Sequence, residues 1–144
     1  RGGHTDLAEG LSMSIFGPDS DDAMALPFWS AAREGRLVLP YDRASGRCTW
    51  YPHAGADIEW REVRGPAKLV AWSVVRAPIN PEFKAPYAPA LVSLDCEPHV
   101  RLVTQIVDCD FADLRCDMPL ELCFRTLEPI RRAPFRAPVF RPAS

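Results

Sequence analysis

The first apolar cluster of the chain is flanked by helix signals. Proline is accepted in the first turn of a helix, and Pro27 follows Leu26 directly. Gly35 follows Arg33 and Glu34, where a residue able to take a positive φ commonly ends a helix. The pattern therefore predicts one short helix from about residue 26 to 34, with Phe28 and Trp29 as its apolar anchors.

After Gly35 the pattern changes to strands. Two apolar runs, 37–41 and 47–51, flank a turn that ends in Ser45-Gly46, which predicts a hairpin. Further runs that alternate or are rich in β-branched and aliphatic residues predict strands. They lie at 58–63, 68–75, 88–94, 100–107 and 119–127, with a short closing strand at 139–140 and a helical turn at 111–114.

The order of these elements predicts a mainly β protein built on a small five-stranded Greek-key barrel. The chain has 15 prolines, gathered at 78–89 and 129–142. Since proline lacks the N–H of a β-ladder, we expect both stretches to be loops or arms and not central strands. The expected organisation is a flexible lead at 1–25, a helix and ribbon at 26–65, and the barrel at 66–144.

Composition narrows the classes of function. The 144 residues carry a formal net charge of −2, and Lys68 and Lys84 are the only lysines, so a nucleic-acid backbone is a poor ligand. No apolar run approaches the roughly 20 residues that cross a membrane. Five cysteines without disulfide-type spacing and the lack of a signal pattern predict a reduced, cytoplasmic protein.

Four segments together resemble a known family. They are Phe28-Trp29 with Arg33 to Leu37, Trp72 to Val75 with Pro86-Tyr87 and Ala90 to Val92, Arg101 to Thr104, and Met118 to Glu121 with Pro138 to Pro142. The order is similar to the zinc-ribbon/OB-fold proteins of domain of unknown function 35. This resemblance implies an OB-fold subunit that helps a thiolase-like partner (thiolase, acyltransferase or retro-aldolase, as in sterol side-chain degradation) to bind an acyl-CoA.

The chain departs from that family at its zinc site. The family carries two CxxC knuckles, whereas Asp42 and Ser45 stand in place of the first, and 53–57 replaces the second. His53, Asp42 and Cys48 mix hard and soft ligands at irregular spacing, which is a poor zinc set. We therefore expect a degenerate ribbon that binds no zinc, with Asp42 closing the turn through backbone N–H groups.

No strong catalytic motif is present. Cys96 and His99 lie three residues apart, but across a turn between strands they need not face each other, so a structural cysteine is the favoured interpretation. Asp108 and Asp110 flank Cys109 and are expected to solvate a turn. We expect no catalytic residue and no bound cofactor in this chain.

The segment 76–87 has the residue types that a CoA ligand requires. Arg76 and Lys84 suit phosphate, while Phe83 and Tyr87 offer ring faces for adenine or the pantetheine arm. The alternative is an exposed loop whose aromatics fold back on the barrel.

Both ends of the folded region carry aromatic and arginine residues, the types that anchor interfaces. The expected contacts with a protein partner are Phe28, Trp29, Arg131, Arg132, Phe135 and Phe140. Arg131 and Arg132 have a second interpretation, as a phosphate-binding cluster with Arg136.

Two other functions remain open at the sequence level. OB-folds commonly bind single-stranded nucleic acid, with aromatics that stack on bases, although the acidic balance disfavours it. A free-standing thioesterase or hydratase would instead turn over acyl-CoA without a partner.

Overall fold

The structure is a computed structural model that describes residues 16–19, 22–52, 55–77, 79 and 81–144. Most of the expected flexible lead, residues 1–15 and 20–21, lies outside this part. Phe16, which belongs to that lead, packs edge-on against Trp29 and Phe135, with ring centroids 5.8 and 6.0 Å away. Gly17 follows with a φ of +137°, and a Cβ there would lie 2.7 Å from the Phe135 ring. The folded contacts therefore begin before residue 26.

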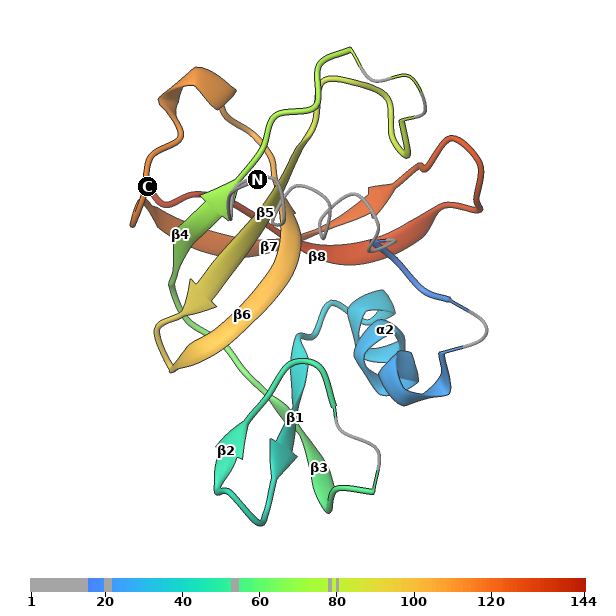
Figure 1. The fold of residues 1–144 in the computed structure, drawn as a ribbon, viewed down its shortest axis with the longest axis vertical. Coiled ribbons are helices and arrows are strands. Elements are labelled where there is room, and N and C mark those ends of the chain that lie inside the picture. The colour runs from blue at the N-terminus through green and yellow to red at the C-terminus, as the bar shows by residue number, and fades with distance from the viewer. Residues whose placement is uncertain (1–15, 20–21, 53–54, 78, 80) are drawn as a thin grey trace, which may run out of the picture.

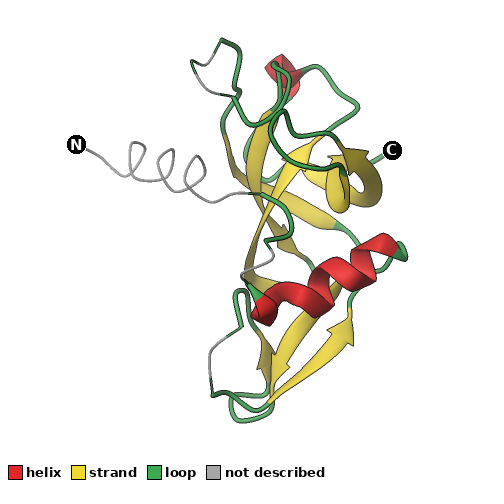
Figure 2. Cartoon of the chain, turned by 90° about the vertical axis from the view of Figure 1, so that its right-hand side faces the viewer, coloured by secondary structure: helices red, strands yellow, loops and turns green. Residues whose placement is uncertain are grey.

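The predicted helix is confirmed. A 3-10 turn, η1 (Ala23–Ala25), leads into α2 (Leu26–Arg33), which has proline in its first turn. Gly35 follows with a φ of +76°, and its N–H donates to the carbonyl of Ala32 at 3.0 Å. Phe28, Ala31 and Ala32 form the buried side of the helix. Figure 2 shows α2 lying between a small sheet and a barrel.

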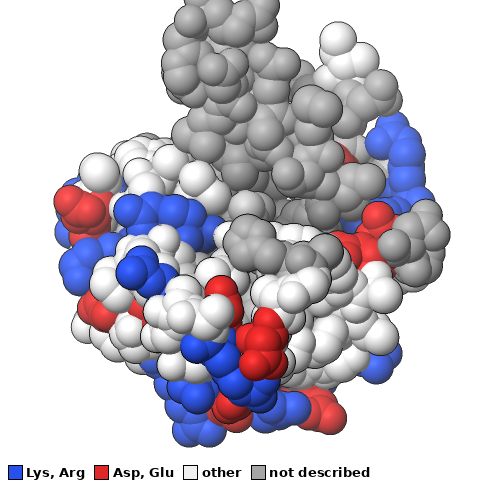
Figure 3. Space-filling model, turned by 60° about the horizontal axis from the view of Figure 1, so that its bottom comes forward, with Lys and Arg blue, Asp and Glu red and all other residues white. Residues whose placement is uncertain are grey.

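The small sheet has the antiparallel order β2-β1-β3, from β1 (Val38–Asp42), β2 (Arg47–Cys48) and β3 (Ile58–Glu62). The predicted hairpin is β1 and β2. Exposed side chains on and next to β3 form ion pairs with one another, such as Arg61 with Glu59 at 2.9 Å and Arg64 with Glu62 at 2.7 Å. Figure 3 shows positive and negative side chains interspersed on this end of the molecule.

The other strands form a closed five-stranded barrel with the order β4-β5-β6-β8-β7, in which β7 pairs back to β4 (Figure 1). Their bounds are β4 (Ala67–Trp72), β5 (Ala88–Leu94), β6 (Glu97–Ile106), β7 (Pro119–Leu127) and β8 (Phe135–Pro142). A 3-10 turn, η2 (Phe111–Asp113), lies between β6 and β7. The predicted mainly β fold with a five-stranded OB-type barrel is confirmed.

The last strand differs from the prediction that the proline-rich stretch 129–142 is loop or arm. β8 pairs with β7 over its whole length but meets β6 at one register position, Ile106↔Phe140. The carbonyl of Phe140 accepts from Val107 N–H, so the backbone of residue 140 points towards β6. Pro138 and Pro142 lie two residues away and point the same way. Their missing N–H groups fall on the sparsely paired side, where no ladder hydrogen bond is lost.

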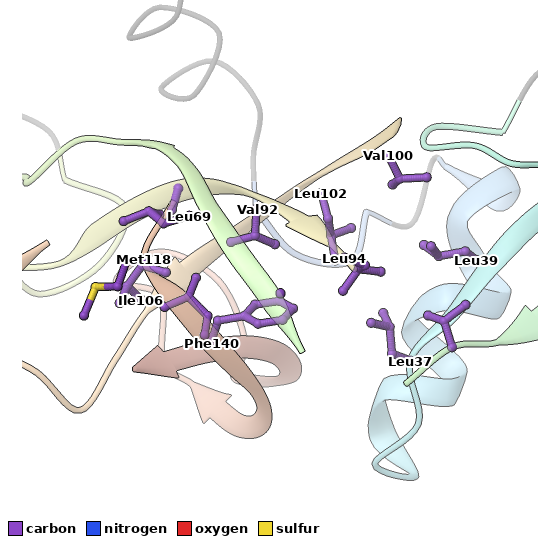
Figure 4. Packing of buried hydrophobic residues seen from close by; sticks show 14 of the residues in the cluster. Leu37, Leu39, Leu69, Val92, Leu94, Val100, Leu102, Ile106, Met118 and Phe140 are labelled. Atoms are coloured by element: carbon purple, nitrogen blue, oxygen red, sulfur yellow. The ribbon is translucent and has the colours of Figure 1, made fainter. Parts of the chain in front are cut away.

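The barrel and the small sheet share one hydrophobic core. Strand β5 buries alternate residues (Ala88, Ala90, Val92 and Leu94), as a half-buried strand should. Figure 4 shows barrel residues such as Leu69, Ile106 and Phe140 on one side, with Leu37 and Leu39 of the small sheet beyond Leu94 and Leu102. In the described part of the chain, no helix has the length and apolar character to cross a membrane.

Candidate functional site

The connection between β4 and β5, residues 73–87, is fixed at two places. Val75 and Tyr87 exchange backbone hydrogen bonds of 2.8 and 3.1 Å at its base. Further out, the carbonyl of Glu82 accepts from Ile130 N–H at 2.7 Å, which joins this loop to the hairpin between β7 and β8. The loop is therefore braced against the barrel.

Two arginines of the hairpin between β7 and β8 help to hold the loop in place. Arg131 donates to the carbonyl of Pro81 at 3.0 Å. Arg132 donates to the carboxylate of Glu82 at 3.2 Å and to the carbonyl of Phe16 at 2.8 Å. Burial raises the pKa of Glu82, while the charge and hydrogen bond of Arg132 act in the opposite direction. These contacts give both arginines a structural role within the chain.

A groove of about 410 Å³ lies between this loop and one mouth of the barrel. The loop contributes Phe83, Lys84, Pro86 and Tyr87, and the barrel contributes residues 105–108, Phe111 and residues 126–128. Three of the four predicted acyl-CoA residues thus come together. Arg76 is exposed on the loop and does not line the groove.

The three residues have different environments. Lys84 is exposed, and Tyr87 is half-buried with its hydroxyl accepting from Glu82 N–H at 3.4 Å. Phe83 is only 6% exposed, and its ring packs on those of Tyr87 and Phe135, with centroids 5.3 and 6.4 Å away. Phe83 forms part of the buried apolar wall of the groove, while Lys84 and Tyr87 carry polar atoms that are more exposed.

Gln105 is a groove residue that sequence reasoning missed. It is 6% exposed and lines the groove near the end of β6. Its neighbour Thr104 is also buried, but the Thr104 hydroxyl donates to the carbonyl of Pro138 at 2.9 Å. In the described part of the chain, the Gln105 carboxamide has no such partner. The available signal was a glutamine in the last part of a strand-like run rich in aliphatic residues, 100–107.

Asp108 lies at the rim of the groove in a left-handed backbone conformation, with a φ of 60°. Arg125 donates to both of its carboxylate oxygens, one of them at 3.0 Å, and Arg141 lies 3.7 Å away. The hydrogen bond from Arg125 is the main cause that lowers the pKa of Asp108. The two arginines balance the charge of Asp108, so the other charged side chains at the groove are Lys84 and Glu128, both exposed.

The expected partner residues divide into buried and half-buried groups. Phe28 is 2% exposed and Phe140 is fully buried, so both are core residues and offer no docking surface in this chain. Trp29 and Phe135 are half-buried and pack on each other with centroids 5.5 Å apart. The correction has a simple cause, because the Phe28 ring packs on those of Trp29 and Trp50, and Phe140 lies in the shared hydrophobic core.

Other apolar side chains, which the sequence pattern did not indicate as surface residues, are exposed. Ile79 on the β4–β5 loop is 98% exposed, and Ile130 on the facing hairpin is 53% exposed. Leu26, at the start of α2, is also exposed. An isoleucine within a proline-rich loop is the pattern that could have indicated such a surface.

The turn between β1 and β2 is closed by hydrogen bonds. The Asp42 carboxylate accepts from Ala44 N–H at 2.9 Å, and the Asp42 carbonyl accepts from Gly46 N–H at 2.8 Å. Asp42 therefore closes the turn, as expected. Burial raises the pKa of the Cys48 thiol to about 11. Among the described residues no three His, Cys, Asp or Glu side chains could hold a metal; His53 lies outside them.

Cys96 and His99 do not form a nucleophile and base pair within the described residues. The Nε2 atom of His99 lies 2.7 Å from the carbonyl of Cys48 and 3.5 Å from a Glu97 carboxylate oxygen. Burial also raises the pKa of the Cys109 and Cys123 thiols, which disfavours their nucleophilic thiolate forms.

Comparisons with known proteins agree with this architecture. Residues 60–125 match the family described as the C-terminal OB-fold domain of ChsH2. A solved structure, described as the Ltp2-ChsH2(DUF35) aldolase, aligns with a TM-score of 0.72 at 28% sequence identity, covering 88% of this chain and 100% of the other. The resemblance to domain-of-unknown-function-35 proteins is thereby confirmed. No curated protein matches the chain.

Proposed function

We propose that this chain is a non-catalytic OB-fold subunit of a thiolase-like enzyme complex that makes or breaks a carbon–carbon bond in an acyl-CoA. The observation that carries the proposal is the likeness to a chain of the Ltp2-ChsH2(DUF35) aldolase, at 28% identity along the whole of that chain. In this proposal the partner supplies the catalytic groups. The present chain contributes part of the acyl-CoA site, around the groove beside the β4–β5 loop.

The chemistry of the chain supports this division of work. The thiols of Cys48, Cys109 and Cys123 have raised pKa values, and His99 is engaged with a backbone carbonyl. The groove offers apolar walls with Lys84 and Glu128 exposed at its edge, so its interior suits the apolar part of a long amphipathic ligand and Lys84 suits a phosphate. Exposed Ile79 and Ile130 give the two joined loops an apolar surface of the kind that a protein partner covers.

The test is to purify the tagged chain from its native host and to identify any thiolase-like protein that elutes with it in fixed stoichiometry. The reconstituted complex should turn over an acyl-CoA, whereas each subunit alone should be inactive. We expect the isolated chain to be poorly soluble and to become well behaved with its partner.

Two results would contradict the proposal. Turnover of acyl-CoA by the isolated chain would favour a thioesterase or hydratase. A monodisperse chain without a thiolase-like partner that binds a single-stranded oligonucleotide with salt-dependent affinity would favour nucleic-acid binding.

A further inference from the structure

We infer that Gln105 binds the amide-bearing pantetheine arm of a CoA thioester in the groove beside the β4–β5 loop. This inference rests on the proposed function and deepens it, because it names the part of the ligand that the groove recognises and the residue that recognises it. Gln105 is the only glutamine of the chain and was not among the residues expected at the site.

The first argument is the state of the Gln105 side chain. Gln105 is 6% exposed and lines the groove, and its side chain makes no hydrogen bond among the described residues, where Thr49 Oγ1 is the one fully buried side-chain atom without a partner. The carboxamide therefore keeps a small exposure to the groove, where water or a ligand satisfies it, whereas most polar side chains at this depth are paired within the protein. The adjacent buried Thr104 follows this rule, since its hydroxyl donates to Pro138. A group left unpaired at the wall of a groove is ready to pair with a ligand.

The second argument is the chemistry that a carboxamide selects. It presents two N–H donors and a carbonyl acceptor without net charge, and so complements another amide. The pantetheine arm is a thin chain with two amides between apolar segments. The groove around Gln105 is similarly apolar, with Phe111, Ile106 and Leu127 among its lining residues. Its volume of about 410 Å³ lies within the ordinary range for small-molecule sites.

The third argument is the separation of charge from the buried amide. Lys84 and Glu128 are exposed at the groove edge, and the Asp108 carboxylate is held by Arg125. All the charged side chains of the groove thus lie at its edge, where a phosphate beside Lys84 stays solvated, and the neutral arm is favoured inside. In this arrangement Lys84 binds a phosphate of the CoA thioester and Gln105 binds its pantetheine arm.

The decisive experiment compares three thioesters of the same acyl group in the native complex. They are the CoA thioester, the pantetheine thioester without the nucleotide, and an alkyl thioester without amides. The measured quantity is the ratio of kcat/KM between two thioesters for the same variant. This ratio does not change with the folded fraction of the enzyme.

The variant Gln105→Met replaces the amide with an unbranched apolar chain. We expect its preference for the pantetheine thioester over the alkyl thioester to fall about threefold to tenfold, the value of one or two hydrogen bonds. Its preference for the CoA thioester over the pantetheine thioester should not change. The melting temperature should change little, since the substitution keeps the size of the side chain and removes no hydrogen bond within the described residues.

Lys84→Ala should give the opposite result: a lower preference for the CoA thioester over the pantetheine thioester and no change in the amide-dependent ratio. Lys68→Ala is the matched control, because Lys68 is the other lysine and pairs with Asp95 at 3.0 Å on another part of the barrel. It should leave both ratios unchanged.

The outcomes separate this inference from the proposed function. A wild-type complex that forms and turns over the CoA thioester, while Gln105→Met keeps the full amide-dependent preference, overturns the inference alone. If no thiolase-like complex forms, the proposed function fails. In that case, binding of the pantetheine thioester to the purified chain by calorimetry still tests Gln105, with equal affinity in wild type and Gln105→Met as the overturning result.

Discussion

The guanidinium of Arg132 lies 3.2 Å from the carboxylate of Glu82 and ties the β7–β8 hairpin to the β4–β5 loop. The same guanidinium donates to the carbonyl of Phe16, so one side chain joins three segments that are far apart in sequence. The position of the groove therefore depends on a residue outside it.

Arg132→Ala should lower the free energy of unfolding by about 1–3 kcal/mol, because it removes two charge-assisted hydrogen bonds and leaves Glu82 half-buried without its cation. Loss of the cation raises the pKa of Glu82 further, so the folded variant binds a proton more readily. The destabilisation should thus shrink as the pH falls into the range where Glu82 is protonated. Denaturant titrations at neutral and acid pH measure it. A loss that is equal at all pH values would contradict the role of Glu82.

Asp108→Asn tests the carboxylate that Arg125 holds. Asparagine tolerates the left-handed conformation, so the change removes charge and keeps the backbone. The pKa of Asp108 is lowered in the folded protein, so the stabilisation is present above about pH 4 and is lost as the pH falls through the lowered value. The variant should melt below wild type at neutral pH, and the gap should close in acid.

Asp117→Asn is the matched control for that experiment. Asp117 also has a positive φ, 63°, but forms no ion pair among the described residues. Its substitution should change the melting temperature little at either pH. If both variants behaved alike, the arginine pair would not explain the effect at Asp108.

Substitutions in the β4–β5 loop should separate binding from stability. Lys84→Ala removes the charge at the groove edge, so the KM of the complex for CoA substrates should rise by roughly tenfold to a hundredfold with little change in kcat. Arg76→Ala should raise KM less, because Arg76 does not line the groove. Tyr87→Ala should also raise KM if the pantetheine arm lies against the ring.

Phe83→Ala should act differently, because its ring is buried. The expected loss is about 3–5 kcal/mol in the free energy of unfolding. Kinetics and thermal melting of the same four variants distinguish the two effects. Wild-type KM values for the Lys84 and Tyr87 variants would remove the loop from the site.

Chelators should leave the melting temperature unchanged, and elemental analysis should find no stoichiometric zinc. The physical reason is that the turn at Asp42 is closed by hydrogen bonds from Ala44 and Gly46, so no metal-binding energy is linked to folding. Asp42→Ala should cost about 0.5–1.5 kcal/mol, the value of one such bond. Near-stoichiometric zinc, or a melting temperature that falls with chelator, would contradict this prediction.

The sequence alone determined the local elements. Helix α2 follows from Pro27 and Gly35, and strand β5 follows from alternating apolar residues between Ala88 and Leu94, since both patterns are set by the period of the backbone. The order of those elements predicted the five-stranded barrel. The four sequence segments, in their order along the chain, indicated the resemblance to the family.

Only the tertiary structure decided which side chains meet. It made Pro138 part of strand β8, because the missing N–H of the proline falls on the side towards β6, where few ladder hydrogen bonds form. It also buried Phe28 and Phe140 in the core. It turned Arg131 and Arg132 inward to carbonyls of the chain and placed Gln105 in the groove. These outcomes depend on contacts between segments that are distant in sequence. The periodic pattern of apolar residues in a helix or strand shows which face is buried, but not which distant side chains it meets.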